Sequence, residues 1–267
     1  MSAHAPTALG AQARALRTRK NVEYLSSEQL ATLRRAFTAA QAIGDDRGYG
    51  HWAGIHGLPL PMYCMHGSRL FLPWHRAYLY FFELALRDQV AEAALAWWDW
   101  TSPASHAHGL PAAYAERQIG GERNPLYSAE VPPAARQSGR PRVTARSPQP
   151  PEQLPRTSEV ERVLSLPDFL DFQSQLEDIH NAVHVWVGGT MGQIPWAAFD
   201  PVFWAHHTMI DRLWRLWQLR HPHSHLPHSL LNQALPPFPM TVAETLEVKA
   251  LGYRYASSSA HAVVEAQ

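Results

Sequence analysis

The sequence has little cysteine and no excess of either charge, and each shortage excludes a class of protein. One cysteine among 267 residues excludes an intramolecular disulfide framework and a cysteine-rich zinc site. Lys+Arg and Asp+Glu are both 23 and no basic stripe stands out, so we expect neither a nucleic acid nor an anionic membrane as a partner. The longest apolar run, AYLYFFELAL, is interrupted by Glu83 and is too short to span a bilayer.

The ends and the middle of the chain predict its organisation. The first twenty residues lack the apolar core of a signal peptide, which favours a cytoplasmic protein. With 46% hydrophobic residues the chain can bury a substantial core, and we find no internal repeat or linker that would divide it. We therefore expect one domain over residues 1–267, with an irregular excursion rich in Pro, Ser, Gly and Arg over about 101–156.

Histidine and tryptophan are abundant, 16 and 10 residues, and many of them lie in segments with helical periodicity. Such segments cover 26–40, with a possible capping box from Ser26 to Gln29, the stretch that ends at AGIHG, and a helix with Pro73 in its first turn. Two more cover about 167–187 and the stretch after Asp200, which is the expected N-cap. The pattern predicts a mainly α protein.

Two histidines of LEDIHNAVHVWVGG are spaced for metal binding. His180 and His184 are four residues apart, so their side chains leave one helical face about one turn from each other, which suits two ligands on one metal. An isolated match of this kind is weak evidence. Glu177 and Asn181 lie on the same face, and a carboxylate and an amide beside the imidazoles favour a site.

The segment DPVFWAHHTMIDRLWRLW places two adjacent histidines on apolar stripes, and periodicity alone does not choose between them. Asp211 follows His207 by four residues, where its carboxylate would be able to orient the ring, and this favours His207 over His206. His66 and His75 are too far apart to share a helical face, so His66 is expected in the loop before Pro73.

Two segments resemble the copper signatures of one family, the tyrosinases, catechol oxidases and molluscan haemocyanins. HGSRLFLPWHRAYLYFFE is similar to the copper-A signature and DPVFWAHHTMID to the copper-B signature. The likeness extends through GYGHWAGIHGLP and WWDW to the GYRY segment, which resembles the end of the family's catalytic domain. It implies a four-helix bundle that encloses a binuclear copper site, with long irregular loops.

The resemblance also implies the ligands. His56, His66 and His75 would hold copper A, and His180, His184 and His207 would hold copper B. The interval from His56 to His66 is short and His51 is an alternative, but IHGLP resembles the family's segment at this point. Neutral imidazole accepts both oxidation states of copper, and two coppers roughly 3.5–4 Å apart can bind and reduce dioxygen between them.

Further roles follow from the same resemblance. Cys64-Met65-His66 matches the Cys-x-His segment in which fungal-type tyrosinases and haemocyanins form a thioether, so a Cys64–His66 crosslink is expected, with a buried unmodified thiol as the alternative. Ile194 resembles a residue that lines the substrate pocket. Glu177 and Asn181 resemble the pair that holds a water beside copper B, where a base would help to deprotonate a phenol.

The implied activity is oxidation of o-diphenols to o-quinones by dioxygen, with ortho-hydroxylation of monophenols. The alternatives are an o-aminophenol oxidase and a haemocyanin-like oxygen-binding protein; a zinc or iron hydrolase is more distant because the expected site lacks carboxylate ligands. The chain ends soon after GYRY, which suggests that no C-terminal shielding domain follows. We expect a small phenol as substrate and allow for a separate copper-loading or shielding protein.

Overall fold

A computed structural model describes residues 16–136 and 142–257 of the chain. The first fifteen residues, on which the expectation of a leaderless chain mainly depends, lie outside this range. The longer helices are α1 (Ser27–Ala42), α2 (Tyr49–His56), α3 (Phe71–Gln89), α6 (Thr157–Leu164), α7 (Phe169–Val187) and α9 (Val202–Arg220). The short ones are α4 (Pro103–His108), α5 (Ala112–Ala115), α8 (Ile194–Ala197), α10 (His228–Leu231), and the 3-10 turns η1 (Val22–Tyr24), η2 (Pro133–Ala135), η3 (Pro151–Gln153) and η4 (Ala243–Thr245).

The helix boundaries agree closely with those predicted from local sequence signals. At α1, Ser26 and Gln29 form the predicted capping box, each side chain bonding to the other's backbone N–H. α7 ends at Gly188, whose positive φ of 62° suits glycine. The start of α9 is one residue later than expected: Pro201 is its N-cap, although the Asp200 carboxylate still accepts a hydrogen bond from the Val202 N–H.

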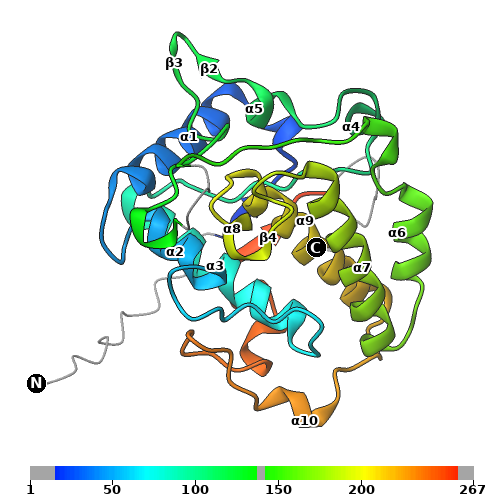
Figure 1. Cartoon of the computed structure of the whole chain (residues 1–267). Helices are drawn as coiled ribbons and strands as arrows, with labels where there is room; N and C mark the ends of the chain where they lie inside the picture. The colour runs from blue at the N-terminus through cyan, green and yellow to red at the C-terminus, as the bar shows by residue number, and fades with distance from the viewer. Residues whose placement is uncertain (1–15, 137–141, 258–267) are drawn as a thin grey trace, which may run out of the picture.

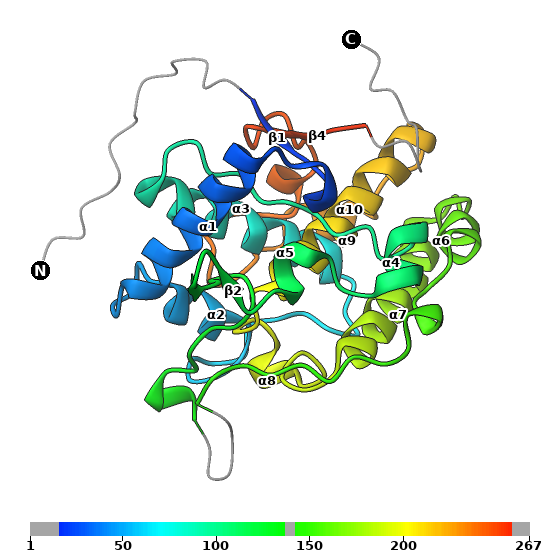
Figure 2. The same ribbon diagram turned by 90° about the horizontal axis from the view of Figure 1, so that it is seen from above.

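The helices that carry the predicted histidines form the centre of the molecule. α3 packs against both α7 and α9, α7 also packs against α9, and α1 covers α2 and α3 (Figures 1 and 2). The Tyr78 hydroxyl of α3 donates to the Trp52 carbonyl of α2 at 2.6 Å, which ties these two helices together. The predicted mainly α fold, a bundle around a histidine cluster, is confirmed.

A buried ionic network joins the two ends of the described chain to this bundle. Strand β1 (Arg17–Arg19) pairs in parallel with β4 (Tyr253–Tyr255). From β1, the fully buried Arg19 donates to Glu83 of α3 at 3.0 Å and to Asp211 of α9 at 3.3 Å. Since isolated buried charges are costly and these are paired and hydrogen-bonded, the network makes the position of both strands specific.

The described parts of the Pro-rich stretch, residues 101–136 and 142–156, lie across one side of the bundle (Figure 1). This stretch contains α4, α5, η2, η3 and a small antiparallel pair of strands, β2 (Gln118–Ile119) and β3 (Glu122–Arg123). Arg146, near its end, donates to the buried Asp200 carboxylate at 2.6 Å and to the Tyr114 carbonyl at 2.6 Å. The segment is therefore anchored to the start of α9.

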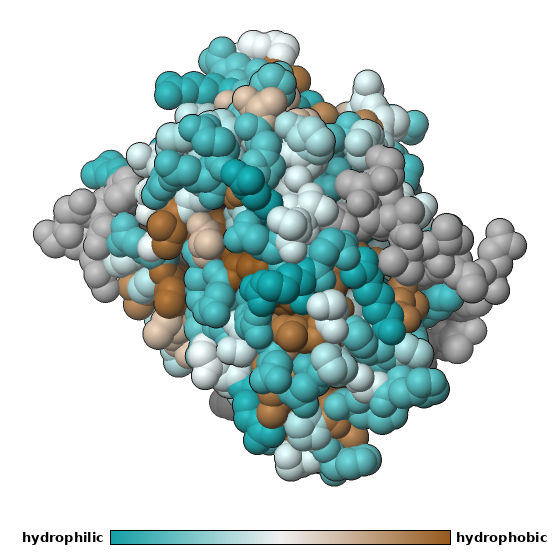
Figure 3. Space-filling model, turned by 90° about the vertical axis from the view of Figure 1, so that its right-hand side faces the viewer, coloured by the Kyte–Doolittle hydropathy of each residue, from teal (hydrophilic) through white to brown (hydrophobic). Residues whose placement is uncertain are grey.

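The face over α6 and α7 is mostly hydrophilic, with apolar residues scattered among polar ones (Figure 3). Within residues 16–136 and 142–257, no helix combines the length and the apolar character that crossing a membrane requires.

Candidate metal centre

Seven histidines and the cysteine meet where α2, α3, α7, α9 and the loop before α3 converge. Their potential ligand atoms form three groups, each with all members within 4.8 Å of one another. The groups are His180, His184, His206 and His207; His56, Cys64 and His66; and His56, His75 and His207. All six histidines predicted as ligands are therefore brought together, and the cluster contains His56 and not His51.

The histidines of α7 and α9 converge on one point. His207 Nε2 lies 3.1 Å from His180 Nε2 and 3.1 Å from His184 Nε2. His184 Nδ1 is 2.8 Å from the Met191 carbonyl, which can only accept, so Nδ1 carries the proton and the Nε2 lone pair is free. His180 Nδ1 lies 3.0 Å from Asn181 Oδ1, which orients that ring in the same way. Three nitrogens at this separation can share a metal ion.

On the opposite side, His56 and His75 are also oriented by backbone carbonyls. His56 Nδ1 lies 3.2 Å from the Ile194 carbonyl, and His75 Nδ1 lies 2.8 Å from the Phe71 carbonyl one turn earlier in α3. With the proton on Nδ1, each Nε2 presents a lone pair. Both Nε2 atoms are buried, and neither has a hydrogen-bond partner among the described residues. A buried nitrogen lone pair without a hydrogen-bond partner costs folding free energy unless it binds another group, and a metal ion is a suitable partner for it.

His66 is the least anchored member of the cluster. It comes from the loop between α2 and α3, its ring centre lies 5.2 Å from that of His56 and 5.3 Å from that of His75, and its ring stacks on His180. Its ligand atom is grouped with those of His56 and Cys64, whereas that of His75 is grouped with His56 and His207. The three histidines predicted for copper A are thus assembled less tightly than the three predicted for copper B.

Two side chains of α7, one turn apart, hold the loop that carries His66. Glu177 Oε1 accepts from the Gly67 N–H at 2.6 Å. The buried Gln173 accepts from the Leu72 N–H at 3.2 Å and donates to the Ser68 carbonyl at 3.2 Å. We call Gln173 and Glu177 the loop clamp. Gln173 was not predicted from the sequence, although its spacing of four from Glu177 places it on the histidine-bearing face of α7.

The geometry favours His207 over His206 as a metal ligand, as predicted, but the reason inferred from the sequence does not hold. His207 directs Nε2 at His180 and His184, while the His206 ring stacks on His180 with ring centres 5.1 Å apart. Asp211 does not orient His207, whose Nδ1 has no hydrogen-bond partner among the described residues. That prediction was wrong because Arg76 and Arg19 engage the Asp211 carboxylate, and they lower its pKa against the opposing effect of burial.

Burial keeps these imidazoles neutral. Desolvation lowers the pKa of every histidine in the cluster, and the proximity of other histidines lowers it further for most of them. For His66 and His184 the pKa falls to about 4. At neutral pH the rings therefore offer lone pairs and not protons. Neutral imidazoles with oriented tautomers are suitable donors for copper, so the residues fit a two-copper site.

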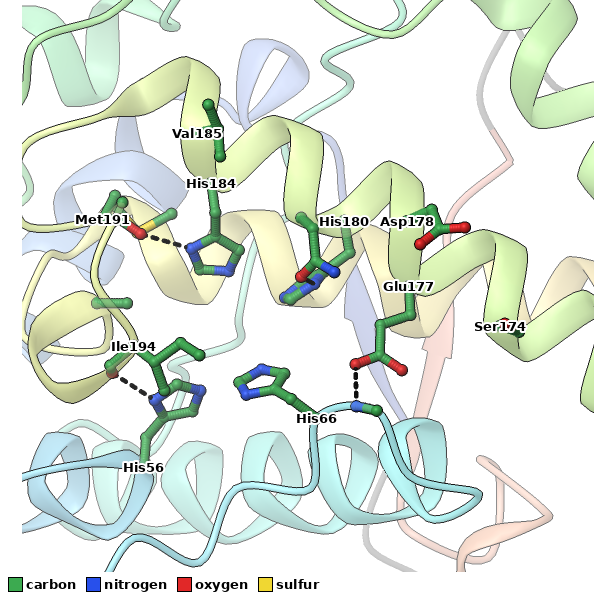
Figure 4. A pocket seen from close by; sticks show the side chains of 14 residues that line it. His56, His66, Ser174, Glu177, Asp178, His180, His184, Val185, Met191 and Ile194 are labelled. Atoms are coloured by element: carbon green, nitrogen blue, oxygen red, sulfur yellow. Dashed lines mark hydrogen bonds between the residues drawn. The ribbon is translucent and has the colours of Figure 1, made fainter.

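A cavity of about 450 Å³ opens beside the cluster (Figure 4). The predicted residues Glu177, Asn181 and Ile194 all line it, together with His56, His66, His180 and His184. Burial raises the pKa of Glu177, opposed by the hydrogen bond from Gly67. Ile194 has a second connection to the cluster, because its carbonyl orients His56.

Cys64 lies beside His56 and His66, as the Cys-x-His interpretation requires. Burial raises the pKa of its thiol to about 12, so the side chain is protonated at neutral pH. A Cys64–His66 thioether stays a prediction.

Comparison with known proteins supports this interpretation. Residues 46–220 match the model of a family described as the common central domain of tyrosinase. The chain is 33% identical over 235 residues to haemocyanin units G and H of Sepia officinalis, covering 80% of this chain and 40% of that one. It is 38% identical over 180 residues to a tyrosinase of Streptomyces lincolnensis, covering 58% of this chain and 65% of that one.

Solved structures agree. A functional unit of octopus haemocyanin superposes with a TM-score of 0.79 at 28% identity, covering 90% of this chain and 68% of that one. The tyrosinase of Burkholderia thailandensis superposes with a TM-score of 0.80 at 23% identity, covering 94% and 76%, a likeness that shows the fold alone. The chain spans less than half the length of the cuttlefish relative.

Proposed function

The chain belongs to the tyrosinase family of type 3 copper proteins, and on that premise we propose that it oxidises phenols with dioxygen. The products would be o-quinones from o-diphenols, with ortho-hydroxylation of monophenols. The observation that carries the proposal is the cavity of about 450 Å³, which connects the histidine cluster to the outside of the protein. An oxygen carrier has no need of such an opening, whereas an oxidase must admit a ring.

The proposal assigns the histidines to two metal ions. His56, His66 and His75 hold one copper, and His180, His184 and His207 hold the other. When bound, the pair supplies two-electron redox chemistry with dioxygen. The protein's part is to keep the six rings neutral by burial and to direct lone pairs inward, through the carbonyls of Ile194, Phe71 and Met191.

Apolar and acidic residues of the cavity have different roles toward the substrate. Ile194, Met191 and Ala197 supply apolar surface against which a phenol ring can pack. Glu177 is the proposed base for monophenols: a phenol with an ordinary pKa of about 10 is protonated at neutral pH and must lose that proton. A carboxylate whose pKa is raised by burial is a stronger base than an exposed one, and Asn181 lies one turn away on α7.

Oxygen uptake by copper-loaded protein tests the proposal, with tyrosine, a catechol and an o-aminophenol as separate substrates. We expect uptake with the catechol and tyrosine. Uptake with the o-aminophenol alone would indicate an o-aminophenol oxidase. Reversible oxygen binding without consumption of any substrate would favour the second candidate, an oxygen-binding protein, which the 33% identity to cuttlefish haemocyanin supports.

The variant Glu177→Gln tests the proton-acceptor role. We expect it to keep both coppers and most catechol oxidation but to lose about 90% or more of tyrosine hydroxylation, the typical scale of a lost general base being 10²–10⁴-fold. Gln preserves an oxygen for the Gly67 N–H, so the loop clamp is retained. Equal losses on both substrates would assign Glu177 a structural role, and no loss on either would exclude it from the reaction.

A further inference from the structure

The mouth of the cavity has two chemically different sides. Along α7, four exposed residues follow helical spacing and line the opening; they are Ser174, Asp178, Asn181 and Val185. The opposite side is formed by the segment leading into α8, where Ile194 presents an apolar side chain that is 46% exposed. In Figure 4, Ser174, Asp178 and Val185 lie along α7 in the upper part of the view, Ile194 lies at the lower left, and His184 lies between α7 and Ile194.

The charged residues that line this cavity are both acidic. Glu177 and Asp178 both line the cavity, while none of the described lining residues is a lysine or an arginine. Neither carboxylate forms an ion pair with any described residue, and burial keeps the neighbouring histidines neutral. A ligand that enters therefore meets negative charge, with no lysine or arginine among the described residues that line the cavity.

His56, a proposed copper ligand, marks the reacting end of this cavity. Its ring is 1% exposed, it lines the same cavity, and its Nε2 atom has no hydrogen-bond partner among the described residues. The same cavity thus extends from the proposed copper ligands to the acidic side of the mouth, where Glu177 and Asp178 lie. A molecule whose phenol end approaches the histidines would leave its tail at the mouth.

We propose that this cavity selects phenols that carry an ammonium group, and that Asp178 is the residue that makes the selection. This inference rests on the proposed function, phenol oxidation. The ring would pack against Ile194, and the cationic tail would lie toward the exposed stripe of α7. A phenol with a carboxylate tail would be repelled from the same position.

Electrostatics sets the size of the expected preference. Asp178 is exposed, so its attraction for a cation acts through a medium close to water and is screened by salt. Exposed ion pairs are weak, and Asp178→Asn should change kcat/KM for a cationic substrate by about 1.5- to 5-fold. The effect should be on KM and not on kcat, because the tail does not contact the reacting atoms.

The test uses three catechols that carry, at the same ring position, an aminoethyl, an ethyl or a carboxymethyl group. With copper-loaded wild-type protein we expect kcat/KM to fall in that order, by about tenfold or more from the first to the last. Asp178→Asn should reduce the preference for the amine, leave the neutral catechol unchanged and speed the anionic one. Raising the salt concentration should have the same effect as the substitution.

Asp171→Asn is the matched control. It makes the same chemical change at an exposed position of α7 that does not line the cavity, and should leave the order of the three substrates unchanged. Equal kcat/KM values for the three catechols, or a preference that Asp178→Asn does not alter, would overturn the inference while phenol oxidation itself stood.

A binding measurement separates this inference from the proposed function. Calorimetry without oxygen, where turnover cannot proceed, compares the binding of tyramine and of hydroxyphenylacetate to the copper-loaded protein. Tighter binding of tyramine that Asp178→Asn weakens would support the selection even if no catechol were oxidised. Equal binding of the two would overturn it.

Discussion

The histidines of α7 and α9 direct three Nε2 atoms at one another across 3.1 Å, whereas on the facing side His66 comes from a loop and shares no ligand group with His75. The difference lies in how each side chain is positioned. A helix sets the direction of its side chains through its own backbone hydrogen bonds, while a loop needs bonds from elsewhere. The loop clamp supplies them from α7, so the helix that carries His180 and His184 also positions the loop that carries His66.

This contrast suggests that the copper-B half is organised before metal binds and that the copper-A half is completed by the clamp, by Cys64 or by the metal itself. The carbonyls that orient His56 and His75 fix the ring tautomers on that side. His66 has no comparable hydrogen bond from its ring to a backbone carbonyl among the described residues. Changes that disturb one half should therefore be separable from changes that disturb the other.

The largest expected effect is the loss of the copper-B half through His207→Ala. Removing the ring at the centre of three converging nitrogens should reduce bound copper from two to one per chain and activity more than 100-fold. Metal analysis counts the copper, and the remaining isolated copper(II) should give the electron paramagnetic resonance signal that a coupled pair lacks.

The control for that experiment is the adjacent residue. His206→Ala removes an equally buried imidazole from the same helix but should leave two coppers bound, because its ring stacks on His180. Loss of copper from His206→Ala together with retention in His207→Ala would reverse the assignment.

Acid should lower the folding stability of the copper-free protein, and histidines of both halves should contribute equally. The folded-state pKa of His66 and of His184 is about 4, below the ordinary value of about 6.5. Between pH 6.5 and 4 these two histidines therefore bind protons in the unfolded chain but not in the folded one. Stability is therefore full above pH 7 and falls as the pH drops from 6.5 toward 4. At pH 5.5 each such histidine lowers the free energy of unfolding by about 1.4 kcal/mol.

Denaturant unfolding of copper-free protein between pH 7.5 and 4.5 measures this dependence. His66→Gln and His184→Gln should each make it shallower by a similar amount, because the two pKa values agree although the two residues are held differently. A dependence that neither variant changes would contradict the assigned cause.

A smaller and more selective effect is expected at the loop clamp. Gln173→Leu leaves the Leu72 N–H and the Ser68 carbonyl without their partner and should loosen the His66 loop. We expect copper-A affinity to fall about 10- to 100-fold, the usual cost of removing an outer-shell bond, with copper B unchanged. Stepwise removal by a chelator, followed by metal analysis, distinguishes the two coppers.

Gln175→Leu is the matched control for the clamp. It makes the same substitution on α7, but its side chain bonds to Arg162 on the surface of the protein. Equal weakening of both coppers by Gln173→Leu, or equal effects of the two variants, would show that the clamp does not act on the copper-A loop in particular.

The smallest expected effect concerns Cys64. If the thioether forms, the Cys64 sulfur bonds to a ring carbon of His66, the S–H and C–H hydrogens are lost, and dioxygen accepts the two electrons. Peptide mass spectrometry of copper-matured protein should find the two residues joined, about 2 Da lighter than their sum and resistant to alkylation. Cys64→Ala should then speed copper-A release only severalfold, and an alkylatable Cys64 in active protein would contradict the crosslink.

Local patterns were sufficient for the helices and for most of the cluster. The capping box at Ser26, the stop at Gly188 and the spacing of His180 and His184 depend on neighbours within one helical turn, so a single sequence reveals them. The copper-A signature added His66 and His75, and the likeness of IHGLP added His56; no periodicity connects these three residues to α7. The single domain and the ligand roles of individual histidines remain predictions.

Contacts between segments distant in sequence could be learned only from the tertiary structure. Asp211 is four residues from His207, yet Arg76 and Arg19 engage it, because a buried carboxylate takes the strongest cationic partners within reach and these come from α3 and β1. The clamp of Gln173 and Glu177 on the loop at residues 67–72 likewise spans about a hundred residues of chain. The sequence by itself determined which residues would supply the donors, since helical spacing and side-chain chemistry are local, and only the folded chain decided how each donor is held and which carboxylate faces the substrate cavity.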